Sequence, residues 1–240
     1  MSKTENSLRL EITQVCHLLY QKEFICASDG NVSVRLASDR FLITPSGLHK
    51  GLLTTDQILL VDGSGQIVET APADSSLKPT SELPMHLEAY RQRADITAVV
   101  HAHPPTAVAL SIAGIDLAPY LLPEVIVFLG RIPTTDYATP SSPENAEAIR
   151  QLIGHHDGLV LKRHGALTVG NSPLQAFMRM ETLEQQARIL FKLHQLGEQH
   201  LDGAHPMPAA DVAKLLQMRQ QMGLMHDGEM ETFRQLYGIQ

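Results

Sequence analysis

Two histidines separated by one residue, His101 and His103, follow a short apolar run at residues 96–100 of this 240-residue chain. Side chains two residues apart on a β-strand point to the same face, so a strand here places the two imidazoles side by side. Pro104 and Pro105 come next and end the strand, because proline cannot donate a hydrogen bond to a neighbouring strand. Two imidazoles on a rigid element are half of a zinc site, which requires further ligands from elsewhere in the chain.

The third imidazole is predicted at His164, which closes a second apolar run and precedes Gly165, a residue that allows a close approach of backbone or ligand. Of the other nine histidines, His86 lies on the helix after Glu82 and could face inward, His155 and His156 lie in a loop where their positions are less fixed, and the remaining six show no ligand geometry. The accompanying carboxylate is predicted to be Glu82, in the first turn of a helix. A glutamate there also complements the helix dipole, so the residues alone leave a structural role and an acid/base role open.

Three loops contain hydroxyl, amide and glycine groups that suit an anion. Thr80 and Ser81 lie beside the exposed N–H groups at the start of the same helix, where anions bind well. Asn31 and the pair Ser46 and Gly47 occur in two earlier turns. Turns of this composition are common, and none of these segments is a Walker loop or a dinucleotide fingerprint.

Composition and charge narrow the classes of partner. The formal net charge is −7 with histidine neutral, which disfavours a nucleic-acid-binding protein or a protein of anionic membrane surfaces. No apolar run approaches the roughly 20 residues that cross a bilayer, and residues 1–6 lack the apolar core of a signal peptide. Cys16 and Cys26 have no redox or metal-ligand spacing. We therefore expect a cytoplasmic protein that binds neither nucleic acid nor membranes.

Hydrophobic periodicity predicts helices and strands along one domain of residues 1–240, with a helical tail at about 200–240. Helices are expected at residues 7–22, 82–93, 106–113, 142–153, 173–196 and 209–222, with Ser81 as the N-cap of the second. Strands are expected at residues 32–36, 40–44, 58–61, 66–69, 96–103, 124–129, 158–164 and 166–169. Because some strands form hairpins and others are separated by helices, we expect a mixed sheet covered by helices.

Five segments in this order resemble the class II aldolase/adducin family: residues 30–35 (GNVSVR), 44–47 (TPSG), 78–82 (KPTSE), 101–104 (HAHP) and 164–166 (HGA). The resemblance extends from about residue 8 to 195. It implies an α/β fold, a three-layer α/β/α sandwich around a mixed, largely antiparallel sheet. It also implies a homotetramer with active sites at the subunit interfaces.

The resemblance implies that His101, His103 and His164 hold Zn²⁺, with Mn²⁺ or Co²⁺ as alternatives. It makes Glu82 the catalytic acid/base and a metal ligand when substrate is absent. The implied reaction is the reversible cleavage of a ketose 1-phosphate, through a metal-stabilised enediolate, into dihydroxyacetone phosphate and a small aldehyde. The residues implied to bind the phosphate are Asn31, Ser46, Gly47, Thr80 and Ser81.

The aldehyde side of the pocket is less well determined. Tyr237 is the nearest counterpart of a C-terminal tyrosine that donates a proton to the aldehyde in this family. Residues 114–139 depart from the family pattern, with Leu122 at the place expected for a substrate-facing tyrosine. The identity of the aldehyde, and the roles of Glu124 and Tyr137, therefore stay open.

Three alternative functions also stay open. A pentulose-phosphate 4-epimerase breaks and remakes the same bond and uses an extra acidic residue, for which Asp116, Glu124 and Asp136 are candidates. A methylthioribulose-phosphate dehydratase would use Glu124 as a base. A non-catalytic, adducin-like interaction protein keeps the fold without the metal site, but the presence of all three histidines and the glutamate favours an enzyme.

Overall fold

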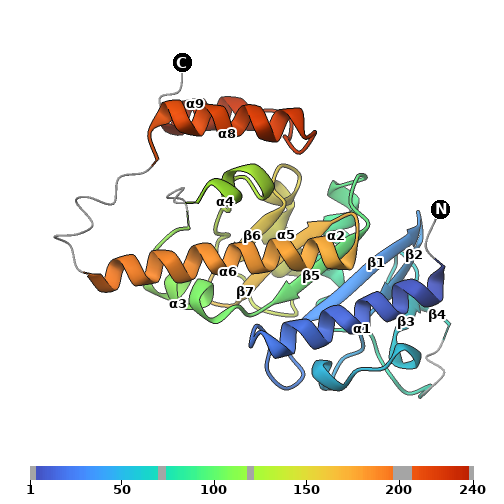
Figure 1. Ribbon diagram of the computed structural model, residues 1–240. Helices are drawn as coiled ribbons and strands as arrows, with labels where there is room; N and C mark the ends of the chain where they lie inside the picture. The colour runs from blue at the N-terminus through green and yellow to red at the C-terminus, as the bar shows by residue number, and fades with distance from the viewer. Residues whose placement is uncertain (1–3, 70–73, 118–121, 197–206, 238–240) are drawn as a thin grey trace.

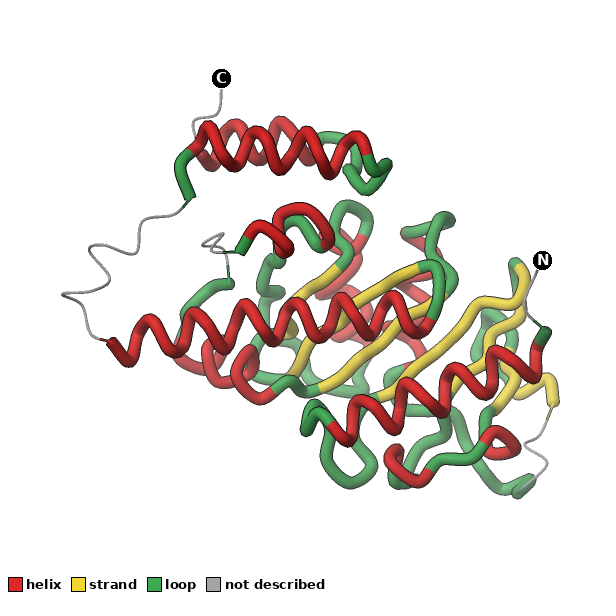
Figure 2. The backbone as a smooth tube through the Cα atoms, viewed as in Figure 1, coloured by secondary structure: helices red, strands yellow, loops and turns green. Residues whose placement is uncertain are grey.

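A seven-stranded sheet forms the middle of the molecule in the computed structural model, which describes residues 4–69, 74–117, 122–196 and 207–237 (Figures 1 and 2). The strand order is β4-β3-β2-β1-β5-β7-β6, and all neighbouring strands in it are antiparallel. The strands are β1 (Asn31–Ala37), β2 (Arg40–Ile43), β3 (Leu59–Val61), β4 (Ile67–Glu69), β5 (Ala98–Ala102), β6 (Gly158–Leu161) and β7 (Gly165–Gly170). A parallel contact joins Thr134 to Val160 as an isolated bridge.

Helices cover both faces of the sheet, which confirms the predicted three-layer α/β/α sandwich (Figure 1). One layer contains α1 (Glu5–Gln21), α3 (Pro105–Ala113), α4 (Pro123–Phe128) and α6 (Pro173–Leu196); the other contains α2 (Leu83–Gln92) and α5 (Pro143–Ile153). Two short 3₁₀ helices, Lys50–Leu52 and Thr55–Gln57, follow β2. Alternation along β5 sends Val100 to the α1/α6 layer and Val99 to the α2/α5 layer. Among the described helices, none has the length and apolar character of a membrane span.

One predicted strand, at residues 124–129, is wrong, because the structure has the helix α4 there. A short apolar run has no periodicity that separates a buried strand from a buried helix. Pro123 occupies the first turn, where its missing N–H costs little, and Gly130, at φ +74°, follows the helix. Tertiary packing of α4 against α8 (Ala209–Gln221) outweighs the β-branched composition of the segment.

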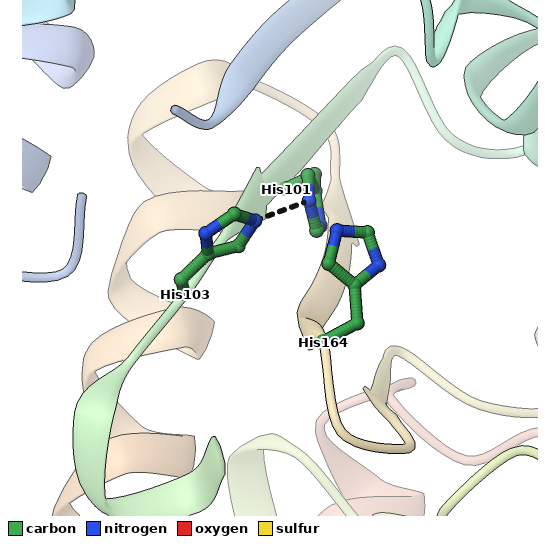
Figure 3. Close-up of side chains that lie close together, drawn as sticks. All are labelled: His101, His103 and His164. Carbon is green, nitrogen blue, oxygen red and sulfur yellow. Dashed lines mark hydrogen bonds between the residues drawn. The ribbon is translucent and has the colours of Figure 1, made fainter. Parts of the chain in front are cut away.

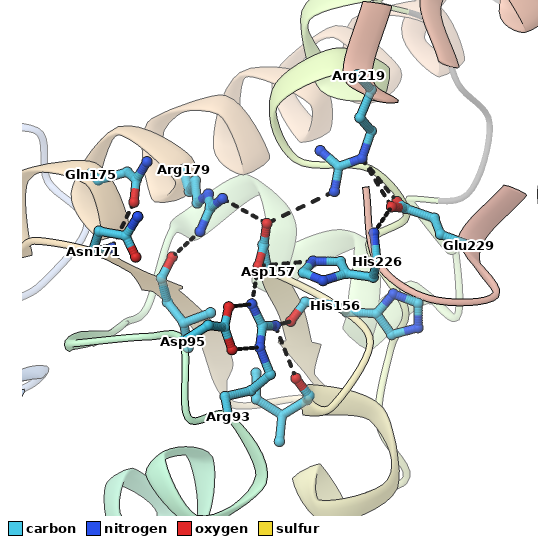
Figure 4. A network of polar contacts seen from close by, with 12 residues as sticks. Arg93, Asp95, His156, Asp157, Asn171, Gln175, Arg179, Arg219, His226 and Glu229 are labelled. Atoms are coloured by element: carbon cyan, nitrogen blue, oxygen red, sulfur yellow. Dashed lines mark hydrogen bonds and ion pairs between the residues drawn. The ribbon is translucent and has the colours of Figure 1, made fainter. Parts of the chain in front are cut away.

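The C-terminal helices α8 and α9 (Glu229–Tyr237) lie above α4 and are joined to the rest of the fold by buried charges (Figures 1 and 4). Asp157, which is 1% exposed and directly precedes β6, lies at the centre of this group. Its carboxylate contacts Arg93 at 3.0 Å, Arg179 at 2.6 Å and His226 at 3.1 Å. Arg219 of α8 lies 3.8 Å from the same carboxylate. One buried anion therefore holds together the end of α2, the helix α6 and the C-terminal segment.

Replacing Asp157 by asparagine is expected to lower the free energy of unfolding by about 3–5 kcal/mol, because buried guanidinium groups lose their shared anion. Burial raises the pKa of Asp157, but the close contact with His226 and the charge of Arg179 lower it from 3.8 to about 2. A carboxylate with a lowered pKa stabilises the fold above its unfolded value, and this contribution disappears as the pH falls from about 4 towards 2. Urea unfolding at neutral and acidic pH measures both effects.

The control for this prediction is Asp95→Asn. Asp95 also pairs with Arg93, at 2.7 Å, but its side chain is 64% exposed. Solvent screens such a pair, so its loss is expected to cost about 1 kcal/mol or less. Equal losses in the two variants would contradict a special role for the buried carboxylate.

Candidate metal centre

The order of strands in the sheet brings the predicted ligands together at the end of its interior strand β5. β5 lies between β1 and β7, so that Asn31 is opposite His101 and Ala166 is opposite Ala102. β5 ends at Ala102, one residue earlier than predicted, and His103 follows it. The backbone N–H of His103 donates to the carbonyl of Phe24 at 2.8 Å, which holds this residue beside the strand end.

His164 lies in the turn that joins β6 to β7, whereas the sequence predicts it at the end of a strand. β6 ends at Leu161, and Arg163 adopts a left-handed conformation at φ +61° within the turn. The pairing of Leu161 with Gly165 makes this turn tight and places it next to the end of β5. The chain therefore presents His164 from a hairpin turn that is held against the two other imidazoles.

Gly165 is required at this position by close contacts. A Cβ atom there would collide with the carbonyl oxygen of Ala102 and would lie 2.8 Å from Cδ2 of His103 and 2.9 Å from Cε1 of His101. The absence of a side chain thus lets the hairpin turn approach the histidine pair, as the sequence predicts.

The three imidazoles converge, as Figure 3 shows. His101, His103 and His164 each present one ring nitrogen, and the three nitrogens lie within 4.8 Å of one another. The Nε2 atoms of His101 and His103 are 3.1 Å apart. Ring centroids are separated by 4.8–5.0 Å, with the planes inclined to one another. Of the described residues, these three form the group that has metal-ligand spacing.

The protonation of the rings suits a divalent cation. Nδ1 of His101 is 2.9 Å from the carbonyl oxygen of Ala166, so Nδ1 carries a proton and Nε2 is the ring nitrogen that faces the cluster. Burial lowers the pKa of His103 to about 3 and that of His164 to about 4, so both are neutral at neutral pH. Three imidazole nitrogens without a fourth match catalytic zinc sites, which keep coordination positions open.

Glu82 lies against this cluster from the helix side. It is the N-cap residue of α2, and its side chain makes no capping hydrogen bond. One carboxylate oxygen accepts from Nδ2 of Asn31 at 2.9 Å and contacts Nε2 of His101 at 3.1 Å. The other accepts from Nδ2 of Asn145 at 3.1 Å and lies 3.5 Å from Nε2 of His164. The carboxylate is therefore directed at the imidazoles, as the prediction requires.

The ionisation of Glu82 depends on its partners. Burial raises the pKa of this carboxyl group, but the charge of His101 and the hydrogen bonds from His101 and Asn31 lower it below the usual range. Burial lowers the pKa of His101 and the charge of Glu82 raises it, with a net increase. A metal ion and a proton compete for Nε2 of His101, so metal binding would replace the proton that these two residues share.

The predicted N-cap, Ser81, is wrong by one residue. Thr80, whose hydroxyl oxygen accepts from the backbone N–H of Glu82 at 3.3 Å, satisfies a donor at the start of the helix. The hydroxyl of Ser81 is instead exposed and 2.7 Å from the hydroxyl of Ser141. The helix therefore begins one residue later, which directs Glu82 inward.

The loops proposed to hold an anion lie together beside Glu82. Pro45 and Pro79 form an antiparallel bridge, and the backbone N–H of Ser46 donates to the carbonyl of Lys78 at 2.9 Å. Ser46 and Gly47 are exposed, and Gly47 has φ +74°. Thr80 and Asn31 are buried and joined by a 3.1 Å hydrogen bond, which directs the amide of Asn31 inward.

One predicted residue has a side chain outside the described part of the structure, and two residues near Glu82 were not predicted as site residues. Tyr237 is the last residue of α9, and its side chain lies outside the described residues. Asn145 belongs to the site but was not predicted, because nothing in the sequence of α5 indicates which residue faces Glu82. His86 lies one helical turn after Glu82, and this spacing of four was the signal that it faces the same way.

Comparison with known proteins assigns the fold to a family. Residues 10–191 match the family described as "Class II Aldolase and Adducin N-terminal domain". The chain belongs to the class II aldolase/adducin family. The L-fuculose phosphate aldolase of Methanococcus vannielii is 37% identical over 179 residues, which are 75% of this chain and 93% of that protein. The 3-oxo-tetronate 4-phosphate decarboxylase of Escherichia coli is 31% identical over 80% of this chain and 90% of its own length.

Solved structures of this family have the same architecture. The L-fuculose-1-phosphate aldolase of Thermus thermophilus superposes with a TM-score of 0.68 at 34% identity, covering 83% of this chain and 97% of that one. YgbL of Escherichia coli, described as a putative aldolase, epimerase or decarboxylase, superposes at 0.79 with 28% identity, covering 89% and 100%. These findings confirm the predicted family, add a resemblance to L-fuculose-1-phosphate aldolases within it, and confirm the prediction of an enzyme by indicating a lyase that acts on sugar phosphates.

Proposed function

We propose that the protein is a zinc-dependent aldolase that reversibly cleaves a ketose 1-phosphate, similar to L-fuculose 1-phosphate, into dihydroxyacetone phosphate and a small aldehyde. The observation that supports it is the convergence of three imidazole nitrogens next to the buried carboxylate of Glu82. A sugar phosphate offers this site a carbonyl and hydroxyl pair for the metal and a phosphate for the adjoining loops.

Each group has a distinct task in this proposal. Zinc on His101, His103 and His164, or Mn²⁺ or Co²⁺ in its place, supplies a Lewis acid for the substrate's carbonyl and hydroxyl oxygens. Glu82 gives a proton to C3 of the cleaved ketose and removes it in the reverse direction. In condensation Tyr237 donates a proton to the aldehyde oxygen, and in cleavage it takes up the proton of the C4 hydroxyl. The groups that hold the phosphate and so position C3 are those of Asn31, Ser46, Gly47, Thr80 and Ser81.

A second candidate function is the decarboxylation of a 3-oxo acid phosphate. It is favoured by the similarity to the Escherichia coli decarboxylase and to YgbL. Loss of CO₂ from a 3-oxo-tetronate 4-phosphate and protonation of the same carbon also yields dihydroxyacetone phosphate. The two reactions therefore share their phosphate handle and their proton transfer and differ in the group that leaves.

The test is to incubate the zinc-loaded protein with dihydroxyacetone phosphate and one aldehyde at a time: lactaldehyde, glycolaldehyde, acetaldehyde or a methylthio aldehyde. We expect a new ketose 1-phosphate with at least one of them, identified by mass spectrometry and NMR. A parallel incubation with 3-oxo-tetronate 4-phosphate measures CO₂ release. In a third, conversion of a pentulose phosphate to its C4 epimer without free aldehyde would indicate an epimerase.

The outcomes separate the candidates. Condensation without CO₂ release supports the aldolase, whereas CO₂ release without condensation supports the decarboxylase. If the protein contains stoichiometric zinc and forms neither product, both candidate functions are overturned. Incubation of dihydroxyacetone phosphate alone in D₂O is an additional measurement, because exchange at the carbon that becomes C3 reports the proton transfer whatever the aldehyde is.

The proposed function includes a domain organisation and an oligomeric state. We propose one cytoplasmic catalytic domain of residues 1–240 with a helical tail, assembled as a homotetramer whose active sites lie at subunit interfaces. Sedimentation velocity measures the assembly state.

A further inference from the structure

Polar side chains form a continuous row between α2 and β1, behind Glu82. On α2 the row consists of Glu82, His86 and Tyr90, which are four residues apart and lie on one helical face. On β1 it consists of Asn31 and Ser33, which are two residues apart and face the same side of the strand. All five residues are buried, with Ser33 and His86 completely inaccessible.

Hydrogen bonds connect the members of this row in sequence. The hydroxyl groups of Tyr90 and Ser33 are 2.8 Å apart, and Oγ of Ser33 is 2.7 Å from Nδ1 of His86. Nε2 of His86 is 2.5 Å from Oδ1 of Asn31. Nδ2 of Asn31 then donates to Glu82 at 2.9 Å, and its other N–H donates to Thr80. The row therefore links the phenol of Tyr90 to the carboxylate beside the metal cluster.

The carboxylate of Glu82, at one end of the row, sets the donor and acceptor of every hydrogen bond in it. An ionised carboxylate only accepts hydrogen bonds, so the amide nitrogen of Asn31 faces Glu82 and its oxygen faces His86. That oxygen also only accepts, so Nε2 of His86 carries a proton. Burial is the largest of the effects that lower the pKa of His86 to about 3, so the ring is neutral and its Nδ1 is an acceptor. Ser33 therefore donates to His86 and accepts from Tyr90.

We propose that His86, held as its Nε2–H tautomer by Ser33, is a positioning residue that orients the Asn31 amide and through it the Glu82 carboxylate. All donors in the row point toward Glu82, and hydrogen bonds aligned in one direction strengthen one another. His86 touches neither substrate nor metal in this arrangement. Its effect on turnover rests on the proposed function, whereas the tautomer and the bonding of Asn31 do not.

The first test reads the hydrogen bonds directly. In protein labelled with ¹⁵N-histidine, long-range ¹H–¹⁵N correlation is expected to show His86 with a protonated Nε2 and a bare Nδ1. The signal is assigned by its absence from His86→Gln. The side-chain N–H protons of Asn31 are expected to exchange with solvent at least about tenfold more slowly in the parent than in His86→Leu. The proposal would be overturned if His86 were an Nδ1–H tautomer or an imidazolium at neutral pH. It would also be overturned if the Asn31 side-chain protons exchanged at the same rate in the parent and in His86→Leu.

The second test compares two substitutions in the zinc-loaded enzyme. His86→Gln keeps an N–H donor near the place of Nε2, whereas His86→Leu removes it. We expect kcat to fall by about 10- to 100-fold in His86→Leu and by no more than about threefold in His86→Gln, with KM and zinc content unchanged in both. A merely structural role would give equal losses in the two variants, or changes in KM and zinc content with no effect on kcat, and would overturn the proposal.

A matched control and a separate readout keep the result interpretable. His17→Leu is the control, because His17 is a partly buried histidine on α1, away from the site, that bonds the carbonyl of Leu53. It is expected to leave kcat at the parent value. If His86→Leu does not fold, Ser33→Ala replaces it, and we expect a mixture of His86 tautomers in the NMR spectrum. If the parent proves inactive on every sugar phosphate, the proposed function fails while the NMR test still decides the positioning role.

Discussion

Replacing Glu82 by glutamine is expected to lower turnover by about a hundredfold to ten-thousandfold, which is the range for removal of a positioned acid/base. Glutamine has nearly the same shape and still accepts from Asn31, but it cannot take up or release a proton at neutral pH. The three imidazoles remain, so the zinc content is expected to equal that of the parent. Steady-state kinetics measures turnover, metal analysis measures zinc content, and D₂O exchange of dihydroxyacetone phosphate measures the proton transfer by residue 82.

Glu144→Gln is the matched control for this substitution. Glu144 lies in the first turn of α5, is exposed, and accepts from the backbone N–H of Thr139 at 3.1 Å. Its replacement is expected to leave turnover within about twofold, because surface substitutions away from the site have small effects. Parent-like turnover in Glu82→Gln would refute the acid/base role of Glu82.

Replacing His103 by alanine is expected to remove the metal and to lower activity by about a hundredfold or more, since Lewis-acid stabilisation is worth several kcal/mol. His103 is the best ligand for this test because its side chain is 27% exposed and lies beyond the end of β5, so the core is little disturbed. Chelation of the parent is expected to have the same effect. Added zinc is expected to restore the chelated parent and to leave the variant inactive.

The control is His156→Ala, at a half-buried histidine outside the cluster. Metal content and the unfolding temperature of both variants are measured together with activity. A parent protein that folds normally but purifies without stoichiometric zinc, and cannot be loaded with it, would favour the adducin-like alternative. Zinc retained in His103→Ala would show that the metal is held elsewhere.

Most helices and hairpins follow from local sequence. The helix from Pro143 is an example, because Ser142 caps it and proline suits its first turn. The apolar run at residues 124–129 is the exception, since a short buried strand and a short buried helix have the same composition. It becomes α4 because it packs against α8, a segment about ninety residues later in the chain.

In the candidate site too, some residues could be predicted from local sequence and others depend on tertiary packing. The three histidines and Glu82 could be selected from residue type, position at the end of apolar runs, and family resemblance. Asn145 could not, because its contact with Glu82 depends on how α5 packs beside α2. The charge cluster around Asp157 was missed for a similar reason, since its partners come from four separate segments.

The sequence by itself determined the residue types that can bind a metal, the family, and the layered α/β architecture, because these depend on local pattern and on ordered motifs. The tertiary structure alone decided which atoms meet. The pairing of β1 with β5 places Asn31 opposite His101, and the packing of α2 over β1 orders the row from Tyr90 to Glu82. Strand register and helix packing are set by contacts between distant segments, and the geometry of the site follows from them.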